Sequence, residues 1–218
     1  MKKYSEKFGE WYDTVMNIPE EVFLKSHRKN LLSGVSGKVL EVGIGTGANL
    51  PFYEADVALI GIEPSPYMLS KAKKRKQKLP HPHRFTLHNV TYEEAEQQHL
   101  ISPESLDAIV CTLVLCTIPE PEKAITVFLK WLKPHGRLLV LEHIKSRCRV
   151  GAIAQNLVNP LWKKLAEGCQ LNRPTDVLLA NSAFEPVHEE YFWLGMPFYK
   201  AEFRKPEMED KQVGSPVK

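Results

Sequence analysis

One segment, Val39-Leu-Glu-Val-Gly-Ile-Gly-Thr-Gly-Ala-Asn-Leu50, carries the strongest structural signal in the chain. An apolar run of strand length leads into Gly43, Gly45 and Gly47, and a helix start follows. Glycines permit a tight turn and let the backbone approach a ligand closely, and a helix N-terminus offers unpaired amide donors. The segment therefore predicts a strand, a ligand-binding turn and a helix.

A carboxylate follows at the spacing expected of a ribose ligand. Glu63 stands at the end of the next apolar run, 20 residues after Gly43. A carboxylate in this position can accept two hydrogen bonds from the hydroxyls of a ribose. Because Gly43-x-Gly45-x-x-Ala48 also satisfies the loose dinucleotide fingerprint, the pattern alone leaves an NAD(P)-dependent oxidoreductase as one candidate.

Three features count against an oxidoreductase. About thirty helical-looking residues precede the first strand, whereas dinucleotide-binding domains usually open with that strand. Tyr67-x-x-x-Lys71, which mimics a reductase catalytic pair, follows the ribose acid directly and cannot reach the far side of the cofactor. Glu41 lies inside the first strand, where a buried carboxylate needs partners. There it would support the glycine loop or the cationic end of a different cofactor.

Outward from this segment, apolar runs of strand length alternate with helical segments. The runs are rich in Val, Ile and Leu, as in parallel strands covered on both faces. Alternation of this kind predicts a parallel, doubly wound α/β sheet with helices on both faces. The predicted strands are 38–42, 57–62, 85–88, 107–112 and 137–143, with two more between 186 and 203 around Leu194-Gly-Met-Pro197. The predicted helices are 49–53, 66–79, 92–98, 122–132 and 175–183.

The chain of 218 residues has the length of one well-buried domain. We predict a single domain over residues 1–205 and a flexible, polar tail over 206–218. Two segments flank the predicted core. Residues 4–33 form a helical cap before the first strand, and residues 145–172 form a helical insertion that closes over the site as a lid.

Composition excludes several classes of function. The net charge is +3, from 29 basic and 26 acidic side chains, which is too balanced to indicate a nucleic-acid partner. The basic run 71–76 is interpreted as a solvated helix face. The four cysteines show no CxxC spacing and favour thiols in a reducing, cytoplasmic setting. The N-terminus does not resemble a signal peptide, and no stretch approaches the roughly 18 apolar residues of a membrane span.

With these residues in view, the chain resembles the class I methyltransferases. Glu41-Val-Gly-Ile-Gly-Thr-Gly47 is similar to their first motif and Gly61-Ile-Glu-Pro-Ser65 to their acidic second motif. Lys133-Pro-His-Gly-Arg-Leu-Leu-Val-Leu-Glu-His143 is similar to their fifth strand and the turn before it, with His135 where glycine is usual. The resemblance implies a Rossmann-like, mostly parallel seven-stranded sheet whose last strand is antiparallel.

Within this class, the chain most resembles the methyltransferase-like enzymes that act on alkyl thiols, and more distantly the quinone-biosynthesis C-methyltransferases. The closer resemblance covers Leu115-Cys-Thr-Ile118, Leu141-Glu-His143, Asn159-Pro-Leu-Trp162 and Gly168-Cys-Gln-Leu-Asn-Arg173. It implies S-adenosyl-L-methionine as the cofactor, S-adenosyl-L-homocysteine as its product, and a small lipophilic acceptor. A thiol is favoured, with a quinol ring or a phospholipid amine as the next options.

The resemblance also implies the residues that bind the cofactor. The glycine loop should approach the methionine moiety, Glu63 the ribose, and Met68 the adenine face. Asn89 and the amide of Val90 should meet the adenine edge, since an asparagine supplies both an acceptor and donors. The complete predicted set is Glu41, Gly43, Ile44, Gly45, Gly47, Asn49, Glu63, Pro64, Met68, Asn89, Val90, Thr112 and Leu113, of which the last two lie near the sulfonium.

The predicted chemistry is an in-line displacement at the sulfonium methyl group, in which the protein aligns the two reactants. His143, at the carboxyl end of the fifth strand, is the candidate base if the acceptor must lose a proton. Trp11 and Tyr12 of the cap, with Leu157 and Trp162 of the insertion, are predicted to line the acceptor pocket.

No metal site is predicted. His81-Pro-His83 and His88 have no cysteine or carboxylate at ligand spacing. Cys169 has no base near it in sequence and is interpreted as a buried thiol rather than a nucleophile. Besides the oxidoreductase, a protein that binds the cofactor without catalysis stays open as an alternative.

Overall fold

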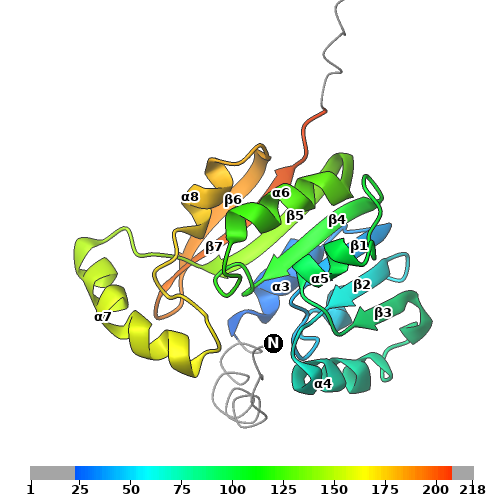
Figure 1. Cartoon of the computed structure of the whole chain (residues 1–218), viewed down its shortest axis with the longest axis horizontal. Coiled ribbons are helices and arrows are strands. Elements are labelled where there is room, and N and C mark those ends of the chain that lie inside the picture. Colours follow the sequence, from blue (N-terminus) through cyan, green and yellow to red (C-terminus); the bar gives the residue numbers. More distant parts are fainter. Residues whose placement is uncertain (1–22, 208–218) are drawn as a thin grey trace, which may run out of the picture.

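Seven strands form one sheet in the computed structural model, which describes residues 23–207 (Figure 1). Their order across the sheet is β3-β2-β1-β4-β5-β7-β6. The first five strands are parallel, and β7 runs antiparallel to both of its neighbours. The strands are β1 (Lys38–Val42), β2 (Ala58–Ile62), β3 (Phe85–His88), β4 (Leu106–Thr112), β5 (Leu132–His143), β6 (Glu185–Trp193) and β7 (Pro197–Arg204). The predicted seven-stranded α/β sheet with an antiparallel last strand is confirmed.

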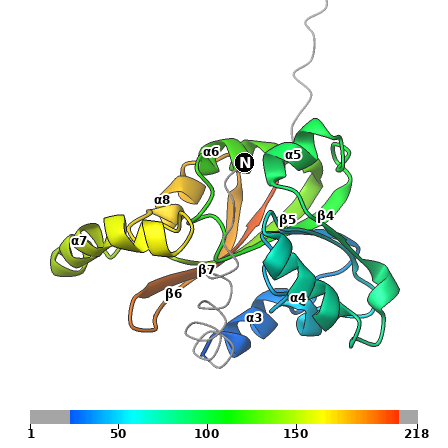
Figure 2. The ribbon, with the colours of Figure 1, turned by 60° about the horizontal axis from the view of Figure 1, so that its bottom comes forward.

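Helices cover both faces of this sheet, as Figure 2 shows. One layer contains α5, α6 and α8, and the other contains α3 and α4. The helices have the bounds α3 (Lys25–Leu32), α4 (Pro66–Lys76), α5 (Tyr92–Gln97), α6 (Pro121–Trp131), α7 (Arg149–Leu165) and α8 (Thr175–Ala180). The layered arrangement explains why the strands read as continuous apolar runs, since each face of the sheet is buried.

Successive residues of a strand face opposite layers. Leu40 and Val42 of β1 pack in the cluster that includes α5 and α6. Val39 packs in the cluster that includes α3 and α4. Because side chains alternate along a strand, Glu41 faces the α3 layer. The same rule sends Glu142 and His143 of β5 to opposite sides.

Strand β1 has β2 as its neighbour on one side and β4 as its neighbour on the other. The strand order therefore reverses between β1 and β4. In sheets of this kind, ligands bind in the crevice outside the carboxyl ends of the strands at the point of reversal. The glycine loop begins at this point, directly after Val42.

Some element bounds differ from the predictions. The predicted helix at 49–53 is one 3-10 turn, Leu50–Phe52, because Pro51 has no N–H to donate and Tyr53 is already extended. Strand β5 begins at Leu132 rather than at 137, because Leu132 already pairs with Leu106 of β4. An irregularity follows in which His135 has φ +60°, and pairing resumes at Arg137. The predicted elements are otherwise found within a few residues of their expected ends.

Helix α7 projects from the body of the molecule in both ribbon views (Figures 1 and 2). It lies within the predicted insertion 145–172 and carries exposed apolar side chains, such as Val150 at 75% and Leu157 at 77% exposure. Most of the predicted cap, with Trp11 and Tyr12, lies outside the described residues, as does most of the predicted tail. Within residues 23–207, no helix combines the length and apolar character that crossing a membrane requires.

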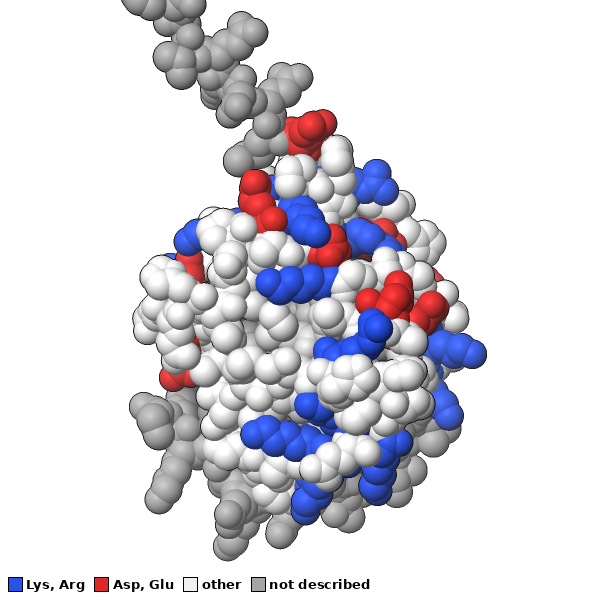
Figure 3. Space-filling view, turned by 90° about the vertical axis from the view of Figure 1, so that its right-hand side faces the viewer, with Lys and Arg blue, Asp and Glu red and all other residues white. Residues whose placement is uncertain are grey.

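The basic run 71–76 belongs to the surface of α4, on the side of the molecule that Figure 3 shows. Four basic residues occupy the last turn of the helix, where positive charge is favourable to the helix dipole. Lys71 Nζ lies 4.6 Å above the ring of Tyr67. This pair, which mimics a reductase dyad in sequence, is a cation–π contact on the helix surface. The interpretation as a solvated helix face agrees with this arrangement.

Candidate active site

The glycine loop has a backbone that other residues would not tolerate. Gly43 has φ +67°, and a Cβ atom there would lie 2.4 Å from Val114 Cγ2. A Cβ atom on Gly47, where φ is +82°, would lie 2.6 Å from Leu50 Cδ1. Gly45 differs, because its nearest neighbour to a Cβ atom would be the Gly43 carbonyl at 3.9 Å. The loop is therefore packed at its ends and open at Gly45, where a ligand can approach.

Glu63 faces this loop from the end of β2. Its carboxylate accepts a hydrogen bond from Gly45 N at 2.9 Å and from Ser65 N at 2.8 Å. The side chain is buried, and desolvation raises the pKa of Glu63 to about 7, with a smaller contribution from the negative charge of Glu167. Two backbone donors thus fix the carboxylate where the resemblance predicts a ribose ligand.

Hydrogen bonds hold the start of α4 and the end of β3 beside Glu63. Ser65 Oγ accepts a bond from Met68 N at 3.4 Å and caps α4, which leaves Met68 half-buried one turn beyond Glu63. Asn89 Nδ2 donates to the carbonyl of Glu63 at 2.8 Å. Asn89 is exposed and Val90 is half-buried. The predicted adenine-side residues therefore lie together at the carboxyl ends of β2 and β3.

A buried polar network lies beside the glycine loop and supplies the partners that Glu41 needs. Asn49 Nδ2 donates to Glu41 Oε1 at 2.9 Å and to Thr112 Oγ1 at 3.0 Å. The Tyr53 hydroxyl donates to Glu41 Oε2 at 2.9 Å. Desolvation raises the pKa of Glu41 to about 7 in spite of these bonds. Three of the predicted cofactor residues, Glu41, Asn49 and Thr112, thus form one unit that joins β1 to β4.

Arg28 completes this network and was not predicted from the sequence. Its Nη1 donates to Asn49 Oδ1 at 2.9 Å and to Thr112 Oγ1 at 3.0 Å, although the residue is only 5% exposed. A signal was present: Leu24, Arg28, Leu31 and Leu32 follow helical spacing and are all buried. An arginine at an apolar position of such a helix indicates a buried polar partner.

The turn after β4 is held by a second buried carboxylate. Leu113 has φ +56°, a backbone conformation that side chains rarely adopt and that is often found at functional sites. The Glu142 carboxylate accepts bonds from the amides of Val114 and Leu115, both at 2.8 Å, and of Cys116 at 3.3 Å. Burial raises the pKa of Glu142. Glu142 therefore fixes the backbone that follows the predicted sulfonium contacts, a role that sequence analysis missed.

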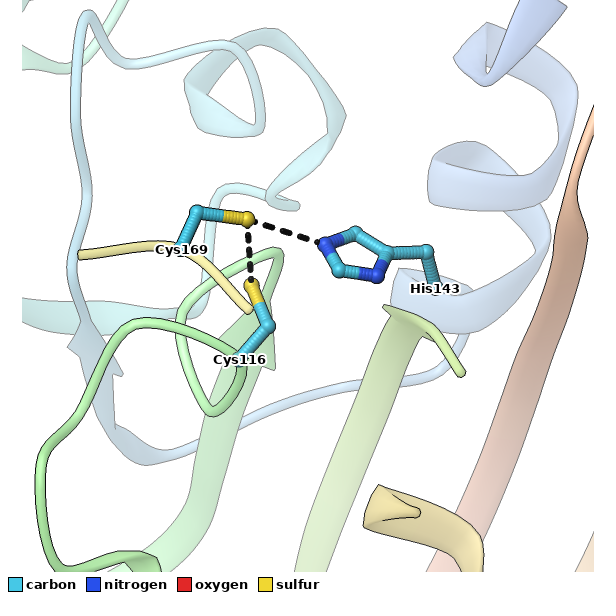
Figure 4. Close-up of side chains that lie close together, drawn as sticks. All are labelled: Cys116, His143 and Cys169. Atoms are coloured by element: carbon cyan, nitrogen blue, oxygen red, sulfur yellow. Dashed lines mark hydrogen bonds between the residues drawn. The ribbon is translucent and has the colours of Figure 1, made fainter. Parts of the chain in front are cut away.

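His143 meets two cysteines on the other side of β5 (Figure 4). His143 Nε2 lies 3.1 Å from Cys169 Sγ, and Cys169 Sγ lies 3.6 Å from Cys116 Sγ. The Cys116 thiol and then His143 hold the pKa of Cys169 well below its usual range, whereas the contact with Cys169 and burial raise the pKa of Cys116. Cys169 has no base near it in sequence, but the fold brings His143 to it from 26 residues away, and the thiol is partly exposed rather than buried.

The insertion reaches the site through the segment that follows α7. Gln170 N donates to the carbonyl of Cys116 at 3.0 Å, and Glu167 is near enough to Glu63 to influence its pKa. Of the predicted pocket residues, Trp162 is half-buried, whereas Leu157 lies on the exposed side of α7 at 77% exposure. The structure therefore brings residues 167–170 to the strand ends and does not bring Leu157 there.

Comparisons with known proteins agree with this geometry. A family model described as a methyltransferase domain matches residues 40–140. A thiol S-methyltransferase of Homo sapiens, TMT1B, is 33% identical over 165 residues, which cover 73% of this chain and 65% of the relative. TMT1B of Rattus norvegicus is 34% identical over 173 residues, which cover 77% of this chain and 68% of the relative. The chain thus spans about two thirds of the length of these relatives.

A solved structure shows the same fold. It is described as a SAM-dependent methyltransferase, possibly a histamine N-methyltransferase, from Thermotoga maritima. The TM-score is 0.66 at 18% sequence identity, with 92% of this chain and 97% of the other covered. Because the identity is low, this likeness bears on the fold alone.

Proposed function

Because the chain belongs to the class I S-adenosylmethionine-dependent methyltransferases, we propose that it transfers a methyl group from S-adenosyl-L-methionine to a small, lipophilic thiol. One observation carries the proposal. The glycine loop, the Glu63 carboxylate and the His143 imidazole all stand at the carboxyl ends of the parallel strands, where a fold of this kind binds its ligands. The oxidoreductase alternative loses its support, because the matching family model and the relatives are methyltransferases.

The cofactor would lie along the ends of β1, β2 and β4. We assign the open backbone at Gly45 to its methionine part and Glu63 to its ribose hydroxyls. Met68, Asn89 and Val90 would surround the adenine. The network of Arg28, Glu41 and Asn49 would act indirectly, because its side chains hold the strand ends at fixed distances. The cofactor supplies the electrophilic methyl group.

The chain's own contribution is to align the acceptor and exclude water. Alignment of this kind can lower a barrier by about 7–11 kcal/mol. A thiol also has to lose its proton before it attacks, because the thiolate is the nucleophile. His143 is the imidazole at the acceptor end of the site, and we assign the preparation of the thiol to it. Its role as a general base stays a prediction.

The thiol is favoured over the other acceptors for two reasons. The two relatives reported above, from Homo sapiens and Rattus norvegicus, are named as thiol S-methyltransferases. The acceptor end also contains the Cys116 and Cys169 thiols, and the nearby Glu142 carboxylate is occupied by bonds from backbone amides. All four cysteines are free, which supports the proposed reducing, cytoplasmic setting.

The test is an acceptor screen with methyl-labelled cofactor. Alkyl and aryl thiols, quinols and phosphatidylethanolamine vesicles would be offered to the purified full chain at equal concentrations. Labelled thioether should form with thiols at a rate well above the rates for the other two classes. Turnover of a quinol or amine with none of any thiol would overturn the proposed acceptor, and absence of S-adenosylhomocysteine binding by calorimetry would overturn the cofactor assignment.

A further inference from the structure

Three soft or borderline metal ligands converge at the acceptor end of the site. Cys116, His143 and Cys169 each point one ligand atom at a common space, and these atoms all lie within 4.8 Å of one another (Figure 4). They come from the turn after β4, the end of β5 and the segment after α7. The set has no local sequence motif, because Cys169 is 26 positions from His143 and 53 positions from Cys116.

The distances resemble those around a tetrahedral zinc ion. Bonds of about 2.3 Å to sulfur and about 2.0–2.1 Å to nitrogen place two thiolate sulfurs about 3.8 Å apart and a sulfur and a nitrogen about 3.5 Å apart. The observed separations are 3.6 Å between Cys116 Sγ and Cys169 Sγ and 3.1 Å between Cys169 Sγ and His143 Nε2. Small side-chain rotations would admit the ion.

Hydrogen bonds with several side chains and amides fix the backbone around Cys116. Glu142 accepts the amide of Cys116, and Gln170 N donates to the carbonyl of the same residue. The guanidinium of Arg173 donates to the carbonyls of Leu115 and Ile118. Cys116 and His143 are buried, whereas Cys169 is partly exposed. A metal site needs ligands fixed by their surroundings and a path from solvent, and this set has both.

We propose that Cys116, His143 and Cys169 bind a zinc ion whose fourth position receives the sulfur of the acceptor thiol. Three protein ligands with one open position are the usual arrangement of catalytic zinc, and a Cys₂His set is one of its known forms. The inference rests on the proposed function, and it specifies how His143 prepares the thiol: as a ligand of the metal that stabilises the thiolate, rather than as the group that takes the proton.

The step balances without a further reactant. The acceptor thiol releases its proton to solvent as it binds the zinc as a thiolate. A sulfur lone pair then attacks the sulfonium methyl carbon, and the carbon–sulfur bond of the cofactor breaks with its electron pair on the departing S-adenosylhomocysteine. The resulting thioether is neutral and a weaker zinc ligand than the thiolate, so it leaves. With two cysteine thiolates and the acceptor thiolate, the site carries a net negative charge, which attracts the sulfonium cation.

The first experiment measures metal binding. The full chain would be purified under reducing conditions from zinc-supplemented medium, and its zinc content compared with that of the Cys116→Ser, Cys169→Ser and Cys148→Ser variants. Cys148 is the matched control, because it is an exposed cysteine outside the cluster. We expect one zinc ion per chain in the wild type and in Cys148→Ser, and at least a tenfold loss of affinity in the other two.

A second measurement does not depend on the variants. Substitution of zinc by cobalt in the wild-type chain should give the ultraviolet sulfur-to-cobalt charge-transfer band and the intense visible bands of a tetrahedral site. Addition of an alkyl thiol should shift these bands. Absence of stoichiometric metal in the reduced wild-type chain, or equal metal in all four proteins, would overturn the site.

A third measurement separates the zinc from the proposed function. The chelator-treated chain should bind S-adenosylhomocysteine as before and lose thiol methylation, with recovery on addition of zinc. Undiminished thiol methylation by the metal-free chain would overturn the zinc role and leave the thiol assignment intact. A metal-loaded chain that binds S-adenosylhomocysteine but methylates no thiol would overturn the thiol assignment and with it the role given to the metal.

Discussion

The cofactor side of the site centres on one continuous stretch of sequence, Gly43 to Glu63, whereas the acceptor side is assembled from three separate segments. Gly45 and Glu63 are 18 positions apart and are joined by one hydrogen bond. Cys169 reaches His143 across 26 positions and Cys116 across 53. A motif of local contacts can be read directly, but long-range contacts depend on how the strands are ordered in the sheet.

The two sides also differ in their chemistry. The cofactor side presents buried carboxylates, which suit hydroxyl and cationic groups, and burial raises the pKa of both Glu41 and Glu63 to about 7. The acceptor side presents two thiols and an imidazole. This difference implies that a substitution on one side should weaken the binding of one ligand and leave the other unaffected. Four experiments test this division.

The largest expected effect concerns turnover alone. We expect His143→Ala to lower the rate of thiol methylation by roughly 10²–10⁴-fold, because it removes the group that prepares the thiol for attack. S-adenosylhomocysteine affinity should stay within about twofold, because the proposed cofactor contacts lie at the ends of β1, β2, β3 and β4 and not on β5. Single-turnover kinetics and calorimetry measure the two. A parallel loss of cofactor affinity would contradict the separation of the two sides.

A stability effect comes next. Removal of one partner from a buried charged network destabilises a protein by about 3–5 kcal/mol, so Arg28→Ala should lower the free energy of unfolding by an amount near the lower end of this range. Urea denaturation measures it. Lys29→Ala is the matched control, since Lys29 is the exposed neighbour on the same helix. Equal unfolding midpoints for the two variants would show that the network contributes nothing to stability.

Cofactor affinity tests the other side. Glu63→Ala removes the carboxylate that accepts from the ribose, and loss of a hydrogen bond to a charged group costs about 1.5–3 kcal/mol. We expect S-adenosylhomocysteine to bind roughly 30–100-fold more weakly by calorimetry. Glu54→Ala, which changes an exposed carboxylate, should bind it as the wild type does. Unchanged affinity in Glu63→Ala would remove the basis of the cofactor assignment.

The smallest effect is a dependence on pH. Desolvation raises the pKa of Glu63 to about 7, so the ionised form that accepts two hydroxyl bonds is the major form only above this pH. Affinity for S-adenosylhomocysteine should therefore fall as the pH drops from 8 to 6, by up to about tenfold per unit below pH 7. Calorimetry of wild type and Glu63→Gln tests this, and the variant should give a flatter profile. An identical slope in both proteins would assign the titration to another group.

The same contrast explains how much the sequence could predict. The glycine turn and Glu63 were found because glycine spacing and a strand-end carboxylate are local signals. The sheet followed from alternating periodicities, and its order agrees with the crossover rule. The start of β5 was missed, because Pro134-His-Gly136 has the composition of a turn although Leu132 before it already pairs with β4.

The polar anchors were missed for a different reason. Arg28 bonds to Thr112 across 84 positions, and Glu142 bonds to amides 26–28 positions away. Contacts over such separations cannot be inferred from a short stretch of sequence. A charged residue at an apolar position of a helix or strand indicates that the residue is buried, but it does not indicate which residues bind it. His143 was singled out by its place at a strand end, but its two sulfur neighbours became visible only in the fold.

Glu142 and His143 are adjacent on β5 and face opposite sides of the sheet, so a single peptide unit links the turn after β4 to the imidazole. A shift of this strand end would displace both at once. New acceptor preferences would thus be hard to obtain by remodelling β5, since the cofactor-facing turn would move with it. We expect diversification of acceptors to occur instead in residues 166–168, which precede Cys169 in the chain and are not part of the sheet.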